Sequence, residues 1–599
     1  MKSRQEMMEM VLAAPGLQRT IARLAGVGDG DEQTCRERAR KCFLEIASDY
    51  SERWLGIWER ILSRLWRNIY DDFIIDQGGI ANIREITRRM PCVILPCHRS
   101  HVDYLILSYI FYQHQIPLPH VAAGDNMNFW PLGYIFRQSG AFFLRRRFHG
   151  DDLYADVFAT YVETLLREGV PIEFFLEGGR SRTGKMVMPK YGMISMILRA
   201  YQDNVSDDIA LLPVYLGYDR IIEEHSYLAE LSGAAKKSES VLDVIKHTRV
   251  MMHRYGRVYV NFGTPISLKS YYAAQTNNFA ELTAAEQQAT YRDVGYRVVA
   301  EINRVATATP IAIVASALLC HGGRETKCSV LAETFSAFHD YLKYRRVNMA
   351  PSLAMKDNAL AAAIQTFIEW ACLVRKENPD ERNGAADSYL LPDDKRLRME
   401  YYKNNIIHHF ISLSFLATAI LACPEAVISF RLVRDDYIFL KRIFSLEFMM
   451  GDDHGGELEE SLAYLRCCGM LQMDEGKDDW ELGEGARERL SIFSGLVGSY
   501  LESYRVVIKV CSQLHNELEK EKDQLSYMRE WAEKMYARGE IVRAESMSGV
   551  TYANALKFLR VEAIISPASS RAEEQAEGIG AVIDKEGLAT LQSHLARFS

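Results

Sequence analysis

The chain has 599 residues, of which 48% are hydrophobic and 25% are charged, and its formal net charge is −8. This is an ordinary globular composition, which excludes a wholly disordered chain, a collagen and a low-complexity scaffold. The acidic balance argues against a nucleic-acid partner, so any anion-binding site must be local. The eleven cysteines include no CxxC pair, which predicts reduced thiols and neither a disulfide framework nor a metal site.

Residues 1–87 are predicted to be helical. The clearest segment is Trp54–Ile69, where apolar residues recur at helical spacing and arginines occupy the other side. The apolar positions are Trp54, Trp58, Ile61, Leu62, Leu65 and Ile69, and the basic positions are Arg53, Arg60, Arg64 and Arg67. Such a helix fits an anionic membrane interface, but it equally fits a surface helix docked on its own domain through its aromatic side chains.

The pattern changes over residues 88–285, where short apolar runs bounded by Gly and Pro alternate with helical patterns. Such runs are typical of buried strands in an α/β sheet. The predicted strands are Cys92–Leu95, His120–Ala123, Ala141–Leu144, Ile172–Leu176, Ile209–Tyr215 and Val258–Phe262. We therefore predict an α/β domain with a mixed sheet flanked by helices, between the helical N-terminal region and a large, mostly helical region over residues 286–599.

The C-terminal region is predicted to begin with a helix at Thr283, where Thr283 and Glu286 form a capping-box pattern. Within the region we expect a loop over Lys376–Ser388, a small strand hairpin around Gly469–Leu482 and a flexible segment over Ser566–Gly580.

Three stretches lack Asp, Glu, Lys and Arg and are long enough to span a bilayer, namely residues 104–124, 305–323 and 404–424. Each is diluted by Pro, His or polar residues. We therefore expect buried helices and loops there, and no membrane-spanning helix.

The first candidate site is His98-Arg-Ser-His-Val-Asp103, directly after the strand Cys92–Leu95. An aspartate can accept the Nδ1 proton of a nearby histidine and stabilise the imidazolium, which makes the pair a general base for a substrate hydroxyl. The competing interpretation is that Ser100-x-x-Asp103 only caps the following helix. Spacing alone also leaves open whether His98 or His101 is the base.

Two basic clusters form the second candidate site. Arg145, Arg146 and Arg147 close one predicted strand, while Arg180, Arg182 and Lys185 follow Glu177-Gly178-Gly179 after another. Basic side chains and glycine amides beyond strand ends suit a phosphate in the crevice of an α/β sheet. The alternative is a solvated basic face.

Residues Gly179–Lys185 also have the spacing of a nucleotide-binding P-loop. Met186 stands where a Ser or Thr would ligand Mg²⁺, and Pro189 follows where a helix should already run. We therefore do not expect a P-loop.

The chain also contains four segments in this order: PCHRSHVDYLILSY, GAFFLRRRF, FFLEGGRSRTGK and LLPVYLGYDR. They resemble the four sequence blocks of the HxxxxD acyltransferases, and most closely those of the membrane-associated bacterial glycerol-3-phosphate 1-O-acyltransferases. The similarity is close over about residues 90–270 and looser through YYKNNIIHHF at 401–410. Only 97 residues precede His98, fewer than in the bacterial members of that family.

The resemblance implies acyl transfer from acyl-CoA or acyl-carrier protein to the sn-1 hydroxyl of glycerol 3-phosphate, giving lysophosphatidic acid. It implies that His98 is the base, with Asp103 as its partner. The phosphate and glycerol would be bound by Arg145, Arg146, Glu177, Gly178, Gly179, Arg180, Ser181 and Arg182, with Pro213 lining the pocket. No resident cofactor or metal is implied, since the acyl donor is a co-substrate.

The same resemblance implies a peripheral protein on the cytoplasmic side of a bacterial inner membrane, with the lipid surface as a partner. Two alternatives remain open at this point. The first is a dihydroxyacetone-phosphate acyltransferase, which shares the blocks, and the second is a catalytically silent acyl- or lipid-binding scaffold of the same fold.

Overall fold

The structure is a computed structural model, and it divides into two compact units. The described residues are 2–26, 31–128, 130, 132–145, 150–231, 254–275, 279–376, 387–424, 427–451, 456–473, 479–513, 521–566 and 584–598. The first unit holds the described residues of Met1–Ser181, Met186–Glu223 and Ser238–Ala306. The second holds those of Arg182–Lys185, Glu224–Lys237 and Thr307–Ser599.

The first unit is built on a mixed eight-stranded sheet. Its strands are β1 (Asp72–Ile75), β2 (Cys92–Pro96), β3 (His120–Gly124), β4 (Ala141–Leu144), β5 (Ile172–Glu173), β6 (Ala210–Tyr218), β7 (Arg257–Phe262) and β8 (Ile266–Ser267). Their order is β1-β7-β6-β2-β5-β3-β4, with β8 beside β6. Strands β6, β2, β5, β3 and β4 run parallel, while β7 and β8 pair with β6 in the antiparallel sense. The predicted mixed sheet is confirmed.

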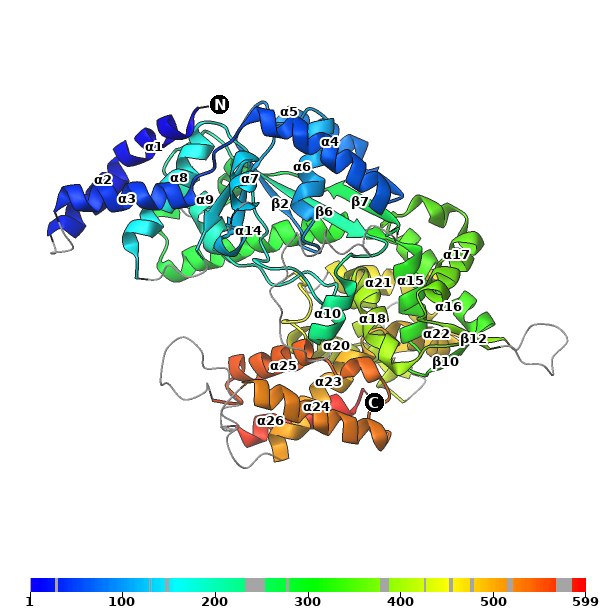
Figure 1. Ribbon diagram of the computed structural model, residues 1–599. Helices are drawn as coiled ribbons and strands as arrows, with labels where there is room; N and C mark the ends of the chain where they lie inside the picture. The colour runs from blue at the N-terminus through cyan, green and yellow to red at the C-terminus, as the bar shows by residue number, and fades with distance from the viewer. Residues whose placement is uncertain are drawn as a thin grey trace. The chain divides into compact units, whose positions relative to one another are not determined.

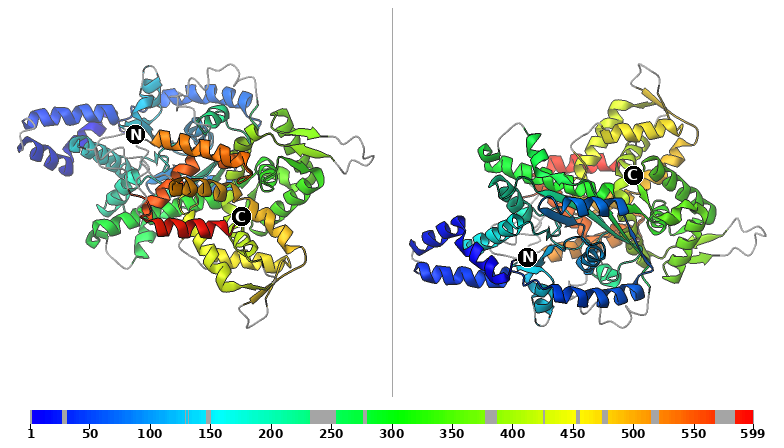
Figure 2. Two further views of the ribbon diagram at one scale, coloured as in Figure 1. Left: turned by 90° about the horizontal axis from the view of Figure 1, so that it is seen from below. Right: turned by 90° about the horizontal axis from the view of Figure 1, so that it is seen from above.

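Helices cover this sheet on both sides, with α4, α5 and α6 on one side and α14 on the other (Figure 1). Near the N-terminus α1, α2 and α3 pack against α8, as Figures 1 and 2 show. The described helices are α1 (Arg4–Ala13), α2 (Pro15–Gly26), α3 (Glu32–Ile46), α4 (Glu52–Ile69), α5 (Gln77–Ile86), α6 (Asp103–Gln113), α7 (Leu132–Gln138), α8 (Asp152–Arg167), α9 (Gly192–Gln202), α13 (Leu268–Ala273) and α14 (Ala284–Arg304).

The second unit is mostly helical, with three small sheets: β10-β13-β12, β11-β9 and β14-β16-β15. Its helices are α10 (Glu224–Leu231), α15 (Pro310–Leu319), α16 (Cys328–Tyr344), α17 (Lys356–Glu369), α18 (Asp393–Asn404), α19 (Ile411–Leu421), α20 (Phe430–Ile443), α21 (Gly456–Cys467), α22 (Ala486–Gly495), α23 (Gly498–Gln513), α24 (Glu521–Ala537), α25 (Gly549–Val561) and α26 (Lys585–Ala596). Its strands are β9 (Thr307–Ala308), β10 (Glu325–Lys327), β11 (Asn348–Met349), β12 (Val374–Lys376), β13 (Ser388–Leu390), β14 (Val427–Ser429), β15 (Leu471–Met473) and β16 (Asp479–Leu482).

Most of the predicted elements are confirmed. Thr283 caps α14 through a full capping box, and β15 pairs with β16 as the expected hairpin. The predicted strand Ile172–Leu176 is shorter, ending at Glu173. Of the predicted flexible segment Ser566–Gly580 and the loop Lys376–Ser388, residues 567–580 and 377–386 lie outside the described residues.

Two expectations about organisation need correction. The N-terminal region is not purely helical, because Asp72–Ile75 pairs with β7 as a strand. Its partner lies far away in sequence, so no local pattern signals the pairing. The expected boundary at residue 285 also differs from the observed one, because α14 packs on β6 and the first unit therefore extends to Ala306.

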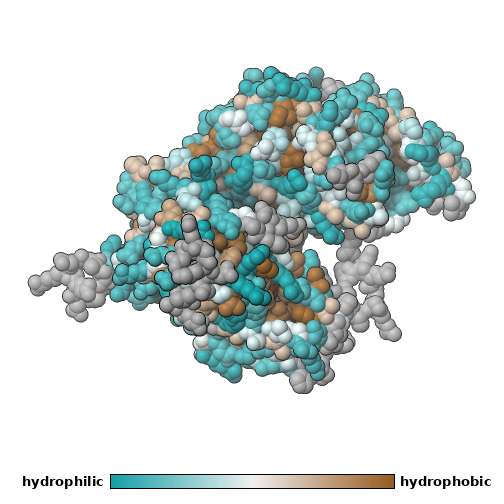
Figure 3. All heavy atoms as spheres, turned by 180° about the vertical axis from the view of Figure 1, so that it is seen from behind, coloured by the Kyte–Doolittle hydropathy of each residue, from teal (hydrophilic) through white to brown (hydrophobic). Residues whose placement is uncertain are grey.

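The three uncharged stretches fold as expected. Helices α15 and α19 are buried almost throughout in the second unit. Across the described residues, we found no helix with both the length and the apolarity needed to cross a bilayer. All eleven cysteines belong to the described residues, and each is a thiol outside any disulfide bond. The face of the molecule drawn in Figure 3 is mainly hydrophilic, with small hydrophobic patches among the polar side chains.

Candidate functional site

The histidine and the aspartate of the first block meet in the first unit, just beyond the carboxyl end of β2. His98 Nδ1 lies 2.9 Å from Asp103 Oδ2. The Asp103 side chain is fully buried, while that of His98 is 16% exposed. The His98 ring stacks on Phe175, with centroids 3.8 Å apart. Because Nδ1 faces Asp103, Nε2 is the ring nitrogen on the far side from the carboxylate, which is the position of the basic nitrogen in a His–Asp general base.

Further hydrogen bonds fix the Asp103 carboxylate. Its Oδ2 accepts from the backbone N–H groups of Arg99 at 2.7 Å and Ser100 at 2.9 Å, and its Oδ1 accepts from the hydroxyl of Tyr218. Donors of this kind stabilise the ionised carboxylate, which compensates for its burial. Sequence reasoning missed Tyr218, although it belongs to the fourth block and ends β6.

A second buried carboxylate, Glu223, holds the turn between His98 and Asp103. It accepts hydrogen bonds from the Ser100 hydroxyl at 2.8 Å and from the His101 backbone N–H at 2.6 Å. Burial raises the pKa of Glu223 above its ordinary value. Ser100 is therefore engaged by Glu223, and α6 begins without a side-chain cap. Asp103 makes one of the two capping-box contacts, because its Oδ2 accepts from the Ser100 backbone N–H. It does more than cap the helix, however, because it also binds His98, which is therefore the histidine hydrogen-bonded to Asp103.

The third block is joined to the first by hydrogen bonds. Glu177 accepts from the backbone N–H groups of His98 at 2.7 Å and Val187 at 2.8 Å, and the Ser181 backbone N–H donates to the His98 carbonyl at 2.9 Å. Burial raises the pKa of Glu177 to about 7, although the positive charge of Arg99 and the two N–H donors each lower it. The blocks after β2 and β5 are thus joined by two hydrogen bonds, both of them at the backbone of His98.

Two glycines and one arginine complete the part of this block in the first unit. Gly178 has φ +62°, which lies in the left-handed region that favours glycine, while a Cβ there would meet only the flexible end of the Lys190 side chain. At Gly179 a Cβ would meet no neighbouring atom. Arg180 Nη1 lies 3.9 Å from Glu223 Oε1, and its side chain is 11% exposed. This places a nearly buried guanidinium beside the Glu223 turn.

The remaining basic residues of the third block belong to the second unit. Arg182 pairs with Glu230 at 3.1 Å and lies over the Tyr227 ring, and Lys185 forms an ion pair with Glu447. The expected single cluster is therefore divided between two environments. No helix follows Lys185 directly, since α9 starts at Gly192, so the segment is not a P-loop.

The second block is only partly described. Arg145 forms hydrogen-bonded ion pairs with Glu45 at 2.7 Å and Asp151 at 3.0 Å, and it lies over the Tyr154 ring. These carboxylates occupy its guanidinium, so the geometry indicates a structural position for Arg145. Arg146 and Arg147 lie outside the described residues.

The fourth block contributes a buried strand. Pro213 pairs with Leu95 in the parallel register of β6 and β2, and its carbonyl accepts from the Gly263 N–H at 2.9 Å. Pro213 thus occupies the sheet interior next to the strand that carries His98. Within the described residues no group of His, Cys, Asp and Glu is arranged to hold a metal ion.

Two family models match the chain. A model described as acyltransferase covers residues 79–217, which include the His98–Asp103 pair. A model described as the glycerol-3-phosphate acyltransferase C-terminal region covers residues 227–568, more than half of the chain. The chain belongs to the glycerol-3-phosphate acyltransferase family. The resemblance seen in the sequence is confirmed at this level.

Similar proteins named glycerol-3-phosphate acyltransferase are identical to this chain at about a third of the aligned positions. The one from Shewanella amazonensis is 32% identical over 85% of this chain and 63% of its own. That from Pseudomonas syringae pv. tomato is 34% identical over 69% of this chain and 50% of its own. The chain thus spans between half and two thirds of the length of these curated relatives.

A solved structure of the 1-acyl-sn-glycerophosphate acyltransferase PlsC from Thermotoga maritima matches 50% of this chain and 97% of its own, at 15% identity and a TM-score of 0.26.

Proposed function

We propose that the protein transfers an acyl group from acyl-CoA or acyl-carrier protein to the sn-1 hydroxyl of glycerol 3-phosphate. The product is lysophosphatidic acid, in the first step of phospholipid synthesis. The observation that carries this proposal is the 2.9 Å hydrogen bond between His98 and the fully buried Asp103, in a chain of the glycerol-3-phosphate acyltransferase family.

In this reaction His98 Nε2 removes the proton from the sn-1 hydroxyl as its oxygen attacks the thioester carbonyl carbon. Asp103 holds the Nδ1 proton and stabilises the imidazolium that forms. The C–O bond forms, the C–S bond breaks, and the proton passes from His98 to the departing thiolate. Stacking on Phe175 fixes the ring plane throughout, so the base needs no reorientation.

The phosphate of the acceptor is assigned to arginines of the second and third blocks. Arg180 supports this role because its guanidinium is nearly buried, 3.9 Å from the carboxylate that holds the catalytic turn. Arg146 carries the same role by its place in the second block. A bidentate arginine contact would orient the glycerol so that its far hydroxyl meets His98. The reaction needs no resident cofactor, since the acyl donor supplies the group transferred.

The test is an acyl-transfer assay with purified protein, palmitoyl-CoA and glycerol 3-phosphate in lipid vesicles, scored for lysophosphatidate. Dihydroxyacetone phosphate replaces glycerol 3-phosphate in a parallel arm. Lysophosphatidate formation that disappears in His98→Ala supports the proposal. Preference for dihydroxyacetone phosphate would reassign the acceptor, and absence of transfer to either acceptor would favour a silent scaffold.

We further propose that the protein binds the cytoplasmic surface of the bacterial inner membrane peripherally, through α4 and α7. Helix α4 docks on its unit through buried Leu62, Trp66 and Ile69, as one sequence interpretation expected. Its outer face nevertheless leaves Ile57 47% and Ile61 50% exposed. The four arginines of α4 are exposed on the same helix.

Two aromatic side chains at or near α7 are also exposed. Trp130 is 87% exposed and Tyr134 is 55% exposed, and Tyr134 contacts Trp54 of α4 edge-on. Exposed apolar and aromatic side chains interspersed with arginines suit an interface rich in anionic lipids.

A further inference from the structure

The tip of the third block, Arg182–Lys185, packs as part of the second unit, although the residues on both sides of it belong to the first. In the first unit Ser181 donates to the His98 carbonyl, and Val187 donates to Glu177. One short segment thus has its two ends fixed beside the catalytic turn and its tip fixed among the C-terminal helices.

The backbone of the tip is held by α18 and α23. Asn404 Nδ2 donates to the Thr183 carbonyl at 2.8 Å, and the Tyr500 hydroxyl in turn donates to Asn404 Oδ1 at 2.7 Å. Gly184 has φ +86°, and a Cβ there would collide with the Tyr401 carbonyl oxygen. Both the conformation and the close approach to α18 therefore require glycine.

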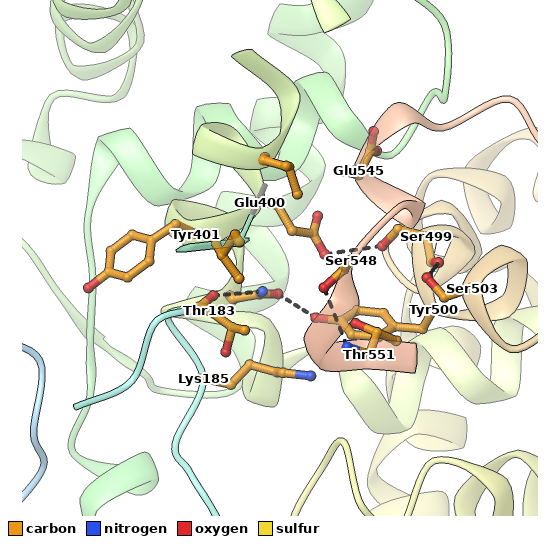
Figure 4. A pocket seen from close by; sticks show the side chains of 13 residues that line it. Thr183, Lys185, Glu400, Tyr401, Ser499, Tyr500, Ser503, Glu545, Ser548 and Thr551 are labelled. Carbon is orange, nitrogen blue, oxygen red and sulfur yellow. Dashed lines mark hydrogen bonds between the residues drawn. The ribbon is translucent and has the colours of Figure 1, made fainter. Parts of the chain in front are cut away.

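The side chain at the end of the tip is held by charge. Lys185 Nζ forms an ion pair with Glu447, with side-chain exposures of 10% and 0%. It also lies 4.3 Å from the centroid of the Tyr500 ring, toward which it extends in Figure 4. Asn554 Nδ2 donates to the other Glu447 oxygen at 3.0 Å. A pair this deeply buried is costly to break, because the remaining charge would lack a partner.

The cleft around the tip is lined mainly by polar groups that bond to one another. Ser499 donates to Glu400 at 3.1 Å, and Ser548 accepts from the Thr551 N–H at 3.4 Å (Figure 4). Since these groups are already paired, the cleft is suited to holding a chain segment in place. We call Asn404, Glu447 and Tyr500 the socket.

We propose that the socket sets the position of the third block, and that Asn404 and Glu447 are positioning residues for glycerol 3-phosphate binding. This inference rests on the proposed function. Arg180 stands two residues before the tip, so fixing Arg182–Lys185 restricts the backbone that carries Arg180. Greater mobility of the tip should weaken binding of the glycerol 3-phosphate phosphate by Arg180 and leave acyl-donor binding largely unchanged.

The kinetic test uses Asn404→Ala and Glu447→Gln. Each should raise the glycerol 3-phosphate KM about tenfold, the effect of one lost hydrogen bond. The palmitoyl-CoA KM should change by less than about twofold, well under 1 kcal/mol. If the acceptor KM stays at its wild-type value in both variants, or if the donor KM rises as much, the inference is wrong.

The matched control is Glu502→Gln. Glu502 and Glu447 are buried to the same degree, each residue as a whole being 5% exposed, and the Glu502 side chain pairs with Arg543 at 2.7 Å in the same unit. Both glutamate variants should lower the melting temperature, but only Glu447→Gln should raise the acceptor KM. An equal rise in Glu502→Gln would show that general destabilisation of the unit is the cause, and would overturn the inference.

Limited trypsin digestion supplies a readout that needs no activity. Arg180, Arg182 and Lys185 are cleavage sites within the segment itself. Cleavage there should be faster in Glu447→Gln than in wild type and unchanged in Glu502→Gln; equal rates in all three proteins would contradict the socket. A wild-type protein that fails to acylate glycerol 3-phosphate would refute the proposed function. The digestion would still show whether the socket holds the tip Arg182–Lys185 in place.

Discussion

At the scale of single residues, the buried carboxylate of Asp103 organises the site through its hydrogen bonds. Its carboxylate accepts from His98, from two backbone N–H groups and from Tyr218, and it is fully buried. This network gives the imidazole one orientation before any substrate arrives. Pre-organisation of this kind lowers the reorganisation needed at the moment of proton transfer.

We predict that His98→Ala and Asp103→Asn each lower kcat/KM for acyl transfer by about 10²–10⁴-fold, the usual effect of losing a general base. The asparagine side chain has only one oxygen that can accept hydrogen bonds, where aspartate has two. In Asp103→Asn the tautomer of His98 is therefore no longer fixed. Steady-state kinetics with palmitoyl-CoA measures the loss, and circular dichroism checks that each variant folds. Wild-type activity in His98→Ala would refute the assignment of the base.

Glu177 gives a pH-dependent prediction. Burial raises its pKa from 4.5 to about 7 in the folded protein. Between these values Glu177 binds more protons in the folded state than in the unfolded state, so its contribution to stability falls as the pH rises from 4.5 to 7. The contribution of Glu177 to the free energy of unfolding is fully present below pH 4.5 and is lost above pH 7. Between these values it falls by about 1.4 kcal/mol per pH unit.

Glu177→Gln removes this titration, so its denaturation free energy should vary less steeply over the same pH window. The comparison uses the slopes with pH, because the amide also disturbs the N–H contacts of His98 and Val187 at every pH. Urea unfolding at several pH values measures both slopes. Identical slopes in the two proteins would show that Glu177 does not titrate in this range.

The sequence predicted the site less completely than the fold. His98 and Asp103 are only five residues apart, so a local sequence pattern was enough to predict that they form a pair. The true environment of Arg145 depends on Glu45, one hundred residues away, and the partner of Lys185 is Glu447. Such long-range ion pairs leave no local pattern, which is why the sequence could not show that Arg145 and Lys185, each in a predicted phosphate-binding cluster, are paired with carboxylates.

At the scale of elements, buried strands were predictable and an edge strand was not. Strands such as β2 and β6 are buried on every residue, so they appear as continuous apolar runs. Strand β1 lies at the sheet edge and exposes Asp72. Its apolar run, Phe73–Ile75, is so short that it resembles the helical sequence pattern around it. The amphipathic helix α4 was predictable, but the choice of its buried face depended on packing.

We predict that replacing Ile57 and Ile61 of α4 by glutamate weakens binding to anionic vesicles at least about tenfold. The change removes the two most exposed apolar contacts of the helix and adds negative charge beside its arginines. Both side chains are about half exposed, so the fold should tolerate the change. Vesicle co-sedimentation with phosphatidylglycerol measures the binding.

A matched control replaces Val542 and Val561 by glutamate, because these side chains are 53% and 70% exposed and lie in the second unit. It should leave vesicle binding at the wild-type level. High salt should weaken binding only in part, since charge is screened and apolar insertion is not. Equal losses in the test and control proteins would show that α4 is not the lipid-binding element.

At the scale of the whole molecule, two compact units with separate cores are linked by more than one crossing of the chain. The second unit contains a buried ion pair between Arg396 and Glu545, whose side chains are each 1% exposed. Arg396 Nη2 donates to Glu545 Oε1 at 2.9 Å, and Arg396 Nη1 donates to the Gly323 carbonyl at 2.8 Å. Removing one partner of such a pair leaves a buried charge uncompensated.

We predict that thermal unfolding proceeds in two transitions, because a chain of this size with two cores seldom unfolds as one cooperative unit. Glu545→Ala should destabilise the second unit by about 3–5 kcal/mol and lower only one transition. Leu166→Ala, at a fully buried position of α8, should cost about 2–5 kcal/mol in the first unit and lower the other. Calorimetry shows the transitions, and hydrogen exchange assigns each to its unit. A single transition lowered by both variants would show instead that the Arg182–Lys185 tip and the other crossings couple the two units into one cooperative structure.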